Sequence, residues 1–189
     1  MLRPLLCSSA ALISRASIGQ ASLRGSASIA MQLDVDALPI FDASGAAVDL
    51  STRAAGRRVA LYFSAGWCPM CTSFEPALTE YRATCEAEGA PVECIMVSSD
   101  RSAADARRRA TELNMPLVSF EGSDREALKR LFKVWAGSEA MQLGFGRRSG
   151  VPALVAIDER GQEVAFVDAE RRGPSALHEW PKAAGVWGG

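Results

Sequence analysis

The sequence predicts an α/β domain with a central mixed β-sheet flanked by helices. Two uninterrupted apolar runs, residues 59–65 and 92–97, are typical of strands buried on both faces of a sheet. Between them, from Pro69 onwards, apolar residues recur at steps of three and four, the period of an amphipathic helix. Near the C-terminus, two short apolar segments joined by a glycine-containing turn predict a β-hairpin. This order of elements implies a mixed sheet with helices on both faces.

The domain is expected to begin with a small β-hairpin. Residues 40–41 and 48–49 flank a polar turn at 42–45. A loop through Gly56 follows and leads into the strand at 59–65.

The helix that begins at Pro69 contains two prolines with different expected effects. Pro69 lies in the first turn, where a helix tolerates proline, whereas Pro76 lies inside the pattern and should kink the helix. Gly89 is expected to end it. The apolar stripe of this helix consists of Cys71, Phe74, Leu78, Tyr81 and Cys85.

The rest of the chain continues with the same periodicities. In chain order, the further expected elements are a charged helix at 102–113, a short strand or extended segment at 115–120, an amphipathic helix at 124–135, an irregular glycine-rich stretch at 136–149, strands at 153–157 and 163–167, and a short helix after Pro174.

Residues 32–182 are expected to form the domain, between a leader at 1–31 and a flexible tail at 183–189. The chain has no acidic residue before Asp34, and the leader contains three arginines among many serines and alanines. This composition is typical of an organellar transit peptide, so we predict a mitochondrial protein. Import into a plastid and secretion are the alternatives.

The composition also bears on the class of partner. The formal net charge is −1, which argues against the concentrated positive surface of a nucleic-acid-binding protein. No stretch approaches the roughly 18 uninterrupted apolar residues that suggest a membrane span. We therefore expect neither nucleic acid nor a membrane as a partner.

Four cysteines lie beyond the leader, which itself contains Cys7; they are Cys68, Cys71, Cys85 and Cys94. A structural zinc site would need all four thiols, because the chain has one histidine and no second Cys-x-x-Cys. Their spacing suits such a site poorly, so we expect no metal and no other cofactor. The pair Cys68 and Cys71 is better explained as a redox-active dithiol.

Cys68 and Cys71 enclose Pro69 and Met70 at the start of the predicted helix. Unpaired N–H groups and the helix dipole favour a thiolate at the first cysteine. Cys68 is therefore expected to attack a substrate disulfide, and Cys71 to resolve the mixed disulfide, leaving the pair oxidised. Trp67 would shield Cys68 and offer a flat surface to the substrate. A structural disulfide is the competing interpretation.

The run from Leu61 to Cys71 resembles the active-site strand and turn of the thioredoxin superfamily, specifically its tryparedoxin/nucleoredoxin branch. The similarity covers residues 32–182. Three further stretches match that branch in order: Val97-Ser98-Ser99-Asp100-Arg101, Gly150-Val151-Pro152 and Glu179-Trp180-Pro181.

The resemblance implies a thioredoxin fold with a cis-proline loop beside the dithiol. It makes Pro152 the cis proline and implies that the backbone of Val151 pairs with the bound substrate. The implied substrate-binding residues are Trp67, Pro69, Met70, Val151 and Pro152.

The chain departs from the family in several places. Thr72 replaces the usual basic residue after the second cysteine, and Met70 stands where tryparedoxins usually have proline. Tyr62 occupies the place of a buried aspartate that many thioredoxins use to manage the second thiol's proton. The proton acceptor for Cys71 is therefore unassigned.

Residues 136–149 look like an insertion before the cis-proline loop. By position, this insertion should lie near the rim of the active site. Arg147 and Arg148 at its end would then supply a rim charge that attracts acidic partners, and an ordinary solvated loop is the alternative.

Together these features predict a thiol–disulfide oxidoreductase that reduces protein or small-molecule disulfides. The expected partners are disulfide-containing proteins, with a peroxidase as one candidate, and a dithiol or reductase as electron donor. One alternative is a redox-sensing interaction module that uses the dithiol as a switch. Another is a metallochaperone that binds a soft metal through Cys68 and Cys71.

Overall fold

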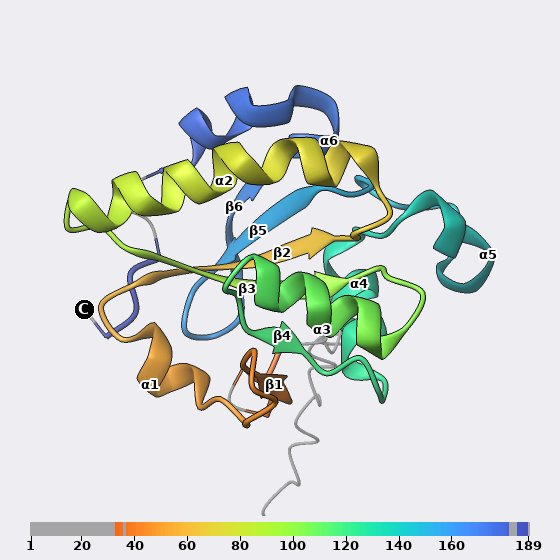
Figure 1. The fold of residues 1–189 in the computed structure, drawn as a ribbon, viewed down its shortest axis with the longest axis horizontal. Helices are drawn as coiled ribbons and strands as arrows, with labels where there is room; N and C mark the ends of the chain where they lie inside the picture. Colours follow the sequence, from red (N-terminus) through yellow and green to blue (C-terminus); the bar gives the residue numbers. More distant parts are fainter. Residues whose placement is uncertain (1–32, 36, 182–184, 189) are drawn as a thin grey trace, which may run out of the picture. The chain divides into compact units, whose positions relative to one another are not determined.

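The apolar runs of the sequence form the centre of a mixed sheet (Figure 1). In the described part of the chain the sheet has six strands in the order β1-β4-β3-β2-β5-β6. They are β1 (Ile40–Phe41), β2 (Arg58–Ser64), β3 (Val92–Ser98), β4 (Leu117–Val118), β5 (Ala153–Ile157) and β6 (Glu163–Val167). Strand β2 pairs in parallel with β3 and antiparallel with β5, and every residue of β2 and β3 is buried. The predicted mixed sheet is confirmed.

The computed structural model describes residues 33–35, 37–181 and 185–188. These residues fall within one unit of the chain, Met31–Gly189. The leader expected at 1–31 lies outside the described residues, so its assignment stays a prediction. Within the described ranges, no helix has both the length and the apolar character needed to cross a membrane.

Helices cover both faces of the sheet. They are α1 (Leu50–Ala54), α2 (Pro69–Ala87), α3 (Ala103–Glu112), α4 (Asp124–Phe132), α5 (Ala140–Leu143) and α6 (Ala169–Arg172), with 3-10 turns η1 (Gly137–Glu139) and η2 (Gly173–Glu179). Figure 1 shows α2 and α6 on one side of the sheet and α1 and α4 on the other. The helix predicted at 124–135 ends three residues early, because Lys133 adopts a left-handed conformation.

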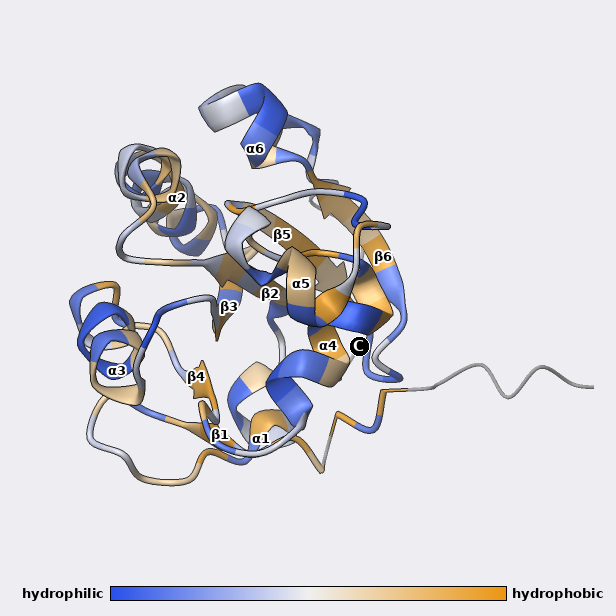
Figure 2. Ribbon diagram, turned by 90° about the vertical axis from the view of Figure 1, so that its right-hand side faces the viewer, coloured by the Kyte–Doolittle hydropathy of each residue, from blue (hydrophilic) through white to orange (hydrophobic). Residues whose placement is uncertain are grey.

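The alternation of side chains along β2 accounts for this two-sided packing. Leu61 and Phe63 join a core cluster with Phe132 of α4, whereas Ala60 and Tyr62 join a second cluster with residues of α2. Figure 2 shows β3, β4 and β5 coloured mainly hydrophobic, while α3 and α6 are largely hydrophilic. The strands therefore form the buried layer, and the helices face solvent on their outer sides.

The N-terminal hairpin is smaller than predicted, and the segment after it is a helix instead of a loop. Phe41 and Ala47 form an antiparallel bridge across the turn, but β1 also pairs with β4 at the edge of the sheet. Asp49, expected in the second arm, instead caps α1, where its carboxylate accepts the Thr52 N–H at 3.3 Å. A five-residue helix is too short to show a helical period, so its cap was the available signal.

Residues 185–188, assigned from the sequence to a flexible tail, pack against the domain. Trp187 is 3% exposed, and its Nε1 donates a hydrogen bond of 3.1 Å to the carbonyl oxygen of Ile157. Val186 and Trp187 also form isolated β-bridges with Arg58 and Ala55. The prediction of a flexible tail is therefore wrong for these residues, because Trp187 completes the core under β5.

Candidate active site

The start of α2 brings the two cysteines of the predicted dithiol together. Cys68 is the N-cap of α2, and its Sγ accepts the backbone N–H of Cys71 at 3.4 Å. Cys68 is 7% exposed and Cys71 is fully buried, and both are free thiols. Cys68 is therefore the more accessible sulfur, and it lies where the backbone N–H groups of the first helical turn point.

The loop before β5 lies against this dithiol. The peptide bond between Val151 and Pro152 is cis, as the resemblance implied. The Sγ of Cys68 donates a weak hydrogen bond of 3.6 Å to the carbonyl oxygen of Val151. Both residues of the loop are buried. Two segments far apart in the sequence thus meet at Cys68.

Burial raises the pKa of the Cys71 thiol to about 12, and its hydrogen bond with Cys68 acts in the same direction. Hydrogen bonds from the backbone of Ala65 and the side chain of Ser64 oppose this rise in pKa. The Cys71 thiol is therefore protonated at neutral pH, and it needs a proton acceptor before it can act as a nucleophile.

The turn that carries Cys68 is held by residues at the end of β3 and directly after it. The Gly66 N–H donates to Asp100 Oδ1 at 2.8 Å, and the Ser98 hydroxyl donates to Asp100 Oδ2 at 2.8 Å. The Trp67 indole donates to the carbonyl oxygen of Ser99 at 2.9 Å. Trp67 itself is 40% exposed, so part of its side chain is available to a substrate. The Val97 to Arg101 stretch thus positions the active-site turn.

The insertion at 136–149 is more ordered than predicted, since it contains η1 and α5. Its base is closed by a β-bridge between Val134 and Ser149. Glu139 anchors the insertion. Its carboxylate accepts a hydrogen bond of 2.5 Å from the buried Lys129 ammonium and one of 2.8 Å from the Ser99 hydroxyl. No sequence pattern marked Glu139 or Lys129, because their pairing depends on how α4 and the insertion pack.

The two arginines predicted as a rim charge are both paired within the chain. Arg147 forms an ion pair of 3.5 Å with Glu170. Arg148 donates to both carboxylate oxygens of Glu163 at 2.8 Å and lies over the ring of Phe166. Their charges are therefore compensated locally, which gives the rim-charge prediction no support.

Instead of free charge, the insertion exposes large apolar side chains. Met141 is 90% exposed and Phe145 is 83% exposed. On the active-site turn, Trp67 and Met70 are also exposed, at 40% and 47%. Figure 1 shows α5 near the end of the sheet at which α2 begins. Large exposed apolar side chains are characteristic of binding surfaces where they form a continuous patch.

The helix that begins at the dithiol also contains a buried carboxylate that the sequence did not single out. Glu75 of α2 is 3% exposed. It accepts hydrogen bonds from Tyr62 at 3.4 Å, from Ser64 at 3.3 Å and from Arg109 Nε at 3.3 Å. It was missed because a charged residue within a predicted helix is ordinarily expected to face solvent.

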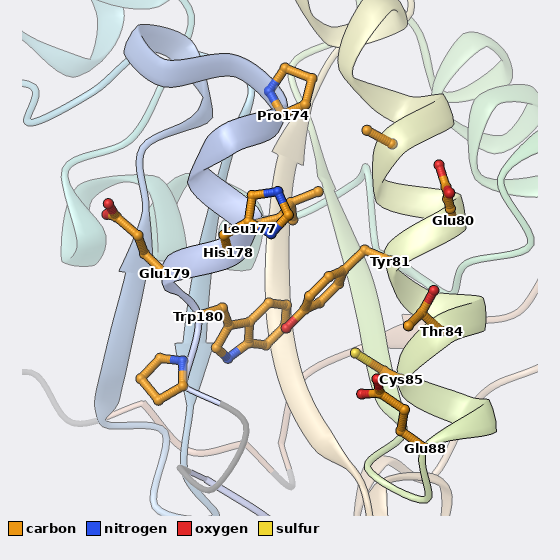
Figure 3. Close-up of a pocket in the computed structure, with 12 residues that line it drawn as sticks. Glu80, Tyr81, Thr84, Cys85, Glu88, Pro174, Leu177, His178, Glu179 and Trp180 are labelled. Carbon is orange, nitrogen blue, oxygen red and sulfur yellow. The ribbon is translucent and has the colours of Figure 1, made fainter.

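A cavity of about 620 Å³ lies between α2 and η2, away from the dithiol (Figure 3). Tyr81 and Trp180 stack in its wall with ring centroids 5.7 Å apart. Cys85, in the last part of α2, also lines it, and its Sγ accepts a hydrogen bond of 3.2 Å from Arg58. Cys85 and Cys94 are buried free thiols, as expected of cysteines that pack as small apolar residues.

Within the residues described, no three or more His, Cys, Asp or Glu side chains group in a way that could hold a metal ion. The absence of a metal or other cofactor stays a prediction.

A strand, a helix that starts with a Cys-x-x-Cys, and a cis-proline loop against the first cysteine define a thioredoxin-fold protein. Thioredoxin from Wuchereria bancrofti superposes with a TM-score of 0.57 at 25% identity, covering 79% of this chain and 91% of that one. Tryparedoxin II from C. fasciculata shares the fold with a TM-score of 0.56 at 24% identity, covering 77% and 89%.

The Thioredoxin-like family model matches residues 56–163, so the chain belongs to the thioredoxin superfamily. Nucleoredoxin of Bos taurus is 31% identical over 133 residues, and that of Danio rerio is 31% identical over 117 residues. These matches cover 69% and 60% of this chain, and 27% and 24% of the two nucleoredoxins. Within that superfamily the chain is similar to nucleoredoxins and tryparedoxins, and its match spans about a quarter of the two animal nucleoredoxins. Membership supports a function of the thiol–disulfide oxidoreductase type.

Proposed function

We propose that this protein reduces disulfides of proteins or small molecules by dithiol–disulfide exchange through Cys68 and Cys71. The position of Cys68 carries the proposal: its Sγ caps α2, 3.4 Å from the N–H of Cys71 and 3.6 Å from the Val151 carbonyl oxygen. Helix N–H groups stabilise an anionic sulfur. Family membership supports the same chemistry.

The exchange has two steps. The Cys68 sulfur attacks one sulfur of the substrate disulfide, forms a mixed disulfide and releases the other substrate sulfur as a thiolate. The Cys71 sulfur then attacks Cys68 Sγ, which breaks the bond to the substrate, releases its second thiolate and leaves Cys68–Cys71 oxidised. A dithiol or a reductase returns two electrons to the pair.

Exposed apolar side chains support proteins as the main substrates. Trp67, Pro69 and Met70 surround Cys68 on the solvent side, and all three are exposed. Met141 and Phe145 extend this apolar character onto the insertion. An unfolded or extended segment that carries apolar residues next to its disulfide would contact both regions. A peroxidase is one candidate among such proteins.

The direct test is dithiothreitol-dependent reduction of insulin by wild type, Cys68→Ser and Cys71→Ser. We expect both variants to lose turnover, and Cys85→Ala, which removes a thiol from the other end of α2, to keep it. Turnover that survives Cys68→Ser would refute the proposal.

The natural substrates can be identified by trapping. Without the resolving thiol, Cys71→Ser should hold its substrate as a mixed disulfide on Cys68. Partners captured by Cys71→Ser, absent from the double variant Cys68→Ser/Cys71→Ser and released by reductant would be the clients of the dithiol.

One observation favours the redox-sensing module as a second candidate. Ser99 contacts both Trp67 and Glu139, so a change at the dithiol can be transmitted to the insertion. A sensor would show no insulin reduction with any of the proteins above. Its binding to a partner would instead change between the reduced and the oxidised dithiol.

We also propose a mitochondrial location, which rests on the composition of the leader. Residues 1–33 fused to a fluorescent protein should direct it to mitochondria. Accumulation in plastids or in the secretory pathway would support one of the two alternatives instead.

A further inference from the structure

A buried glutamate lies one helical turn beyond the resolving cysteine. Cys71 and Glu75 are four residues apart in α2, so their side chains project from the same face of the helix. Cys71 is fully buried and Glu75 is 3% exposed. Burying an ionised carboxylate costs free energy unless the group is paired and hydrogen-bonded. The groups that contact Glu75 therefore have to compensate its charge.

Ser64 connects this face of α2 to the sheet. It ends β2, and its side chain alternates in step with Ala60 and Tyr62, which pack in the cluster that includes α2. The fully buried Ser64 hydroxyl donates to Glu75 Oε1 at 3.3 Å, and the same side chain is one of the groups whose interaction lowers the pKa of the Cys71 thiol. A hydroxyl donates one hydrogen bond and accepts others, so it can take a proton on one side and release one on the other.

Arg109 of α3 compensates the charge of this carboxylate. Its Nε donates to Glu75 Oε1 at 3.3 Å, and its Nη2 pairs with Glu75 Oε2. The Arg109 side chain is 19% exposed and also pairs with the more exposed Glu112 at 2.7 Å. An open cavity of about 570 Å³, lined by Glu75 and Arg109 among others, leads from this pair to solvent.

We propose that Glu75, acting through the Ser64 hydroxyl, accepts the proton that Cys71 loses when it resolves the mixed disulfide. The inference rests on the proposed function of the dithiol. It assigns Glu75 and Ser64 as positioning residues for proton transfer, while Cys71 remains the reacting thiol.

In the resolving step, the Cys71 thiol proton passes to the Ser64 oxygen, and the Ser64 hydroxyl proton passes to Glu75 Oε1. The electron pair left on the Cys71 sulfur forms the bond to Cys68 Sγ, and the bond between Cys68 and the substrate sulfur breaks. The substrate leaves as a thiolate, which takes a proton from water. Glu75 returns its proton when a donor dithiol reduces the pair again, or releases it through the cavity beside Arg109.

The Cys71 thiol needs an internal proton acceptor, and this route supplies one. Burial raises the pKa of Cys71 to about 12, so few molecules would carry its thiolate at neutral pH without an internal acceptor. Tyr62 also donates to Glu75, but burial raises the pKa of its phenol as well, which makes it a donor to the carboxylate and a poor base.

The test separates the two sulfur steps with Ellman's reagent, an aromatic disulfide whose leaving thiolate is coloured. Attack by Cys68 releases the first coloured thiolate in a second-order phase, and resolution by Cys71 releases the other in a first-order phase. The measurement uses the full chain with Cys7→Ser as background, so that a thiol of the leader does not contribute.

Glu75→Gln and Ser64→Ala should each slow the resolving phase by about 100-fold near neutral pH, the lower range of general base catalysis. The deficit should shrink as the pH rises, because hydroxide then removes the Cys71 proton. The attacking phase should not change, and Glu75→Asp should recover part of the rate. Glu112→Gln is the matched control, since it removes an exposed carboxylate partner of Arg109 and should resolve at the wild-type rate.

An unchanged resolving phase in both variants, or a deficit that is equal at every pH, would overturn the inference. If Glu75→Gln does not fold, Ser64→Ala still decides the question, because it leaves the Glu75–Arg109 pair in place. Failure of the proposed function looks different. In that case Cys68→Ser would retain both phases, or wild type would show neither.

Discussion

The indole Nε1 of Trp67 donates a hydrogen bond of 2.9 Å to the carbonyl oxygen of Ser99. The hydroxyl of the same serine donates to Glu139 at 2.8 Å. The exposed tryptophan beside Cys68 and the insertion therefore share one anchor, which directly follows β3. A displacement of the insertion would change the support of the Trp67 ring.

Trp67→Phe tests the first of these contacts. It keeps an aromatic ring beside Cys68 but removes the N–H donor. A hydrogen bond of this kind contributes about 0.5–1.5 kcal/mol, so we expect KM for insulin to rise about 2- to 10-fold with little change in kcat. Trp187→Phe, which removes the comparable 3.1 Å bond to Ile157, should lower stability and leave KM unchanged. Equal KM values for the two variants would contradict this role of Trp67.

Lys129 and Glu139 form the buried ion pair that holds the insertion. The Lys129 side chain is 1% exposed and that of Glu139 is 18% exposed. Lys129→Met leaves the Glu139 carboxylate without its cation and should lower the free energy of unfolding by about 3 kcal/mol in urea titrations. The double variant Lys129→Met/Glu139→Leu should recover part of the loss, because it leaves no unpaired charge. A double variant that is less stable than Lys129→Met would argue against this account.

The exposed apolar residues of the insertion should affect protein substrates selectively. Met141→Ser/Phe145→Ser is expected to raise KM for insulin several-fold. It should not change the reaction with Ellman's reagent, which carries no peptide segment to contact the insertion. The control is Val164→Ser, which alters a 37% exposed residue on β6. Identical insulin kinetics in the double variant and in this control would remove the insertion from substrate binding.

The stability of the reduced protein should fall at alkaline pH. A cysteine thiol in an unfolded chain has a pKa of about 8.5. Burial raises the pKa values of Cys71 and Cys94 to about 12. Between these values the unfolded chain has lost protons that the folded chain keeps. The free energy of unfolding should therefore decrease as pH rises, by up to about 1.4 kcal/mol per pH unit for each thiol.

Urea unfolding under reducing conditions, at about pH 7 and about pH 10, measures this slope. Cys94→Ala should show a shallower decline than wild type, since one of the two thiols is gone. A wild-type stability that is flat or rises over this range, or the same slope in both proteins, would contradict the prediction.

The central elements could be predicted because their signals are local. The run at 59–65 and the stripe from Cys71 to Cys85 each repeat with the period of one type of secondary structure, so β2 and α2 follow from periodicity. Segments without a period were predicted less well. The helix α1 has five residues, and α5 in the insertion has four, so neither completes enough turns to show an apolar stripe.

Pairings between distant residues could not be read from the order of residues. In the sequence, Arg147 and Arg148 look like two adjacent basic residues without acidic partners. The fold brings Glu170 to Arg147 and Glu163 to Arg148. Trp187 looks like part of a frayed end, and its indole reaches β5. In each case the partner lies more than ten residues away, and only chain packing brings it close.

The sequence by itself determined the α/β class, the two central strands, the dithiol at the start of α2, and the cis proline through the family resemblance. Each depends on neighbouring residues whose chemistry is local: apolar period, helix N-terminus, a two-cysteine spacing. Only the tertiary structure decided what surrounds the dithiol. Glu75, Ser64 and Arg109 come from α2, β2 and α3, and a proton acceptor for Cys71 emerges only where those three elements meet, because a hydrogen bond requires atoms in contact.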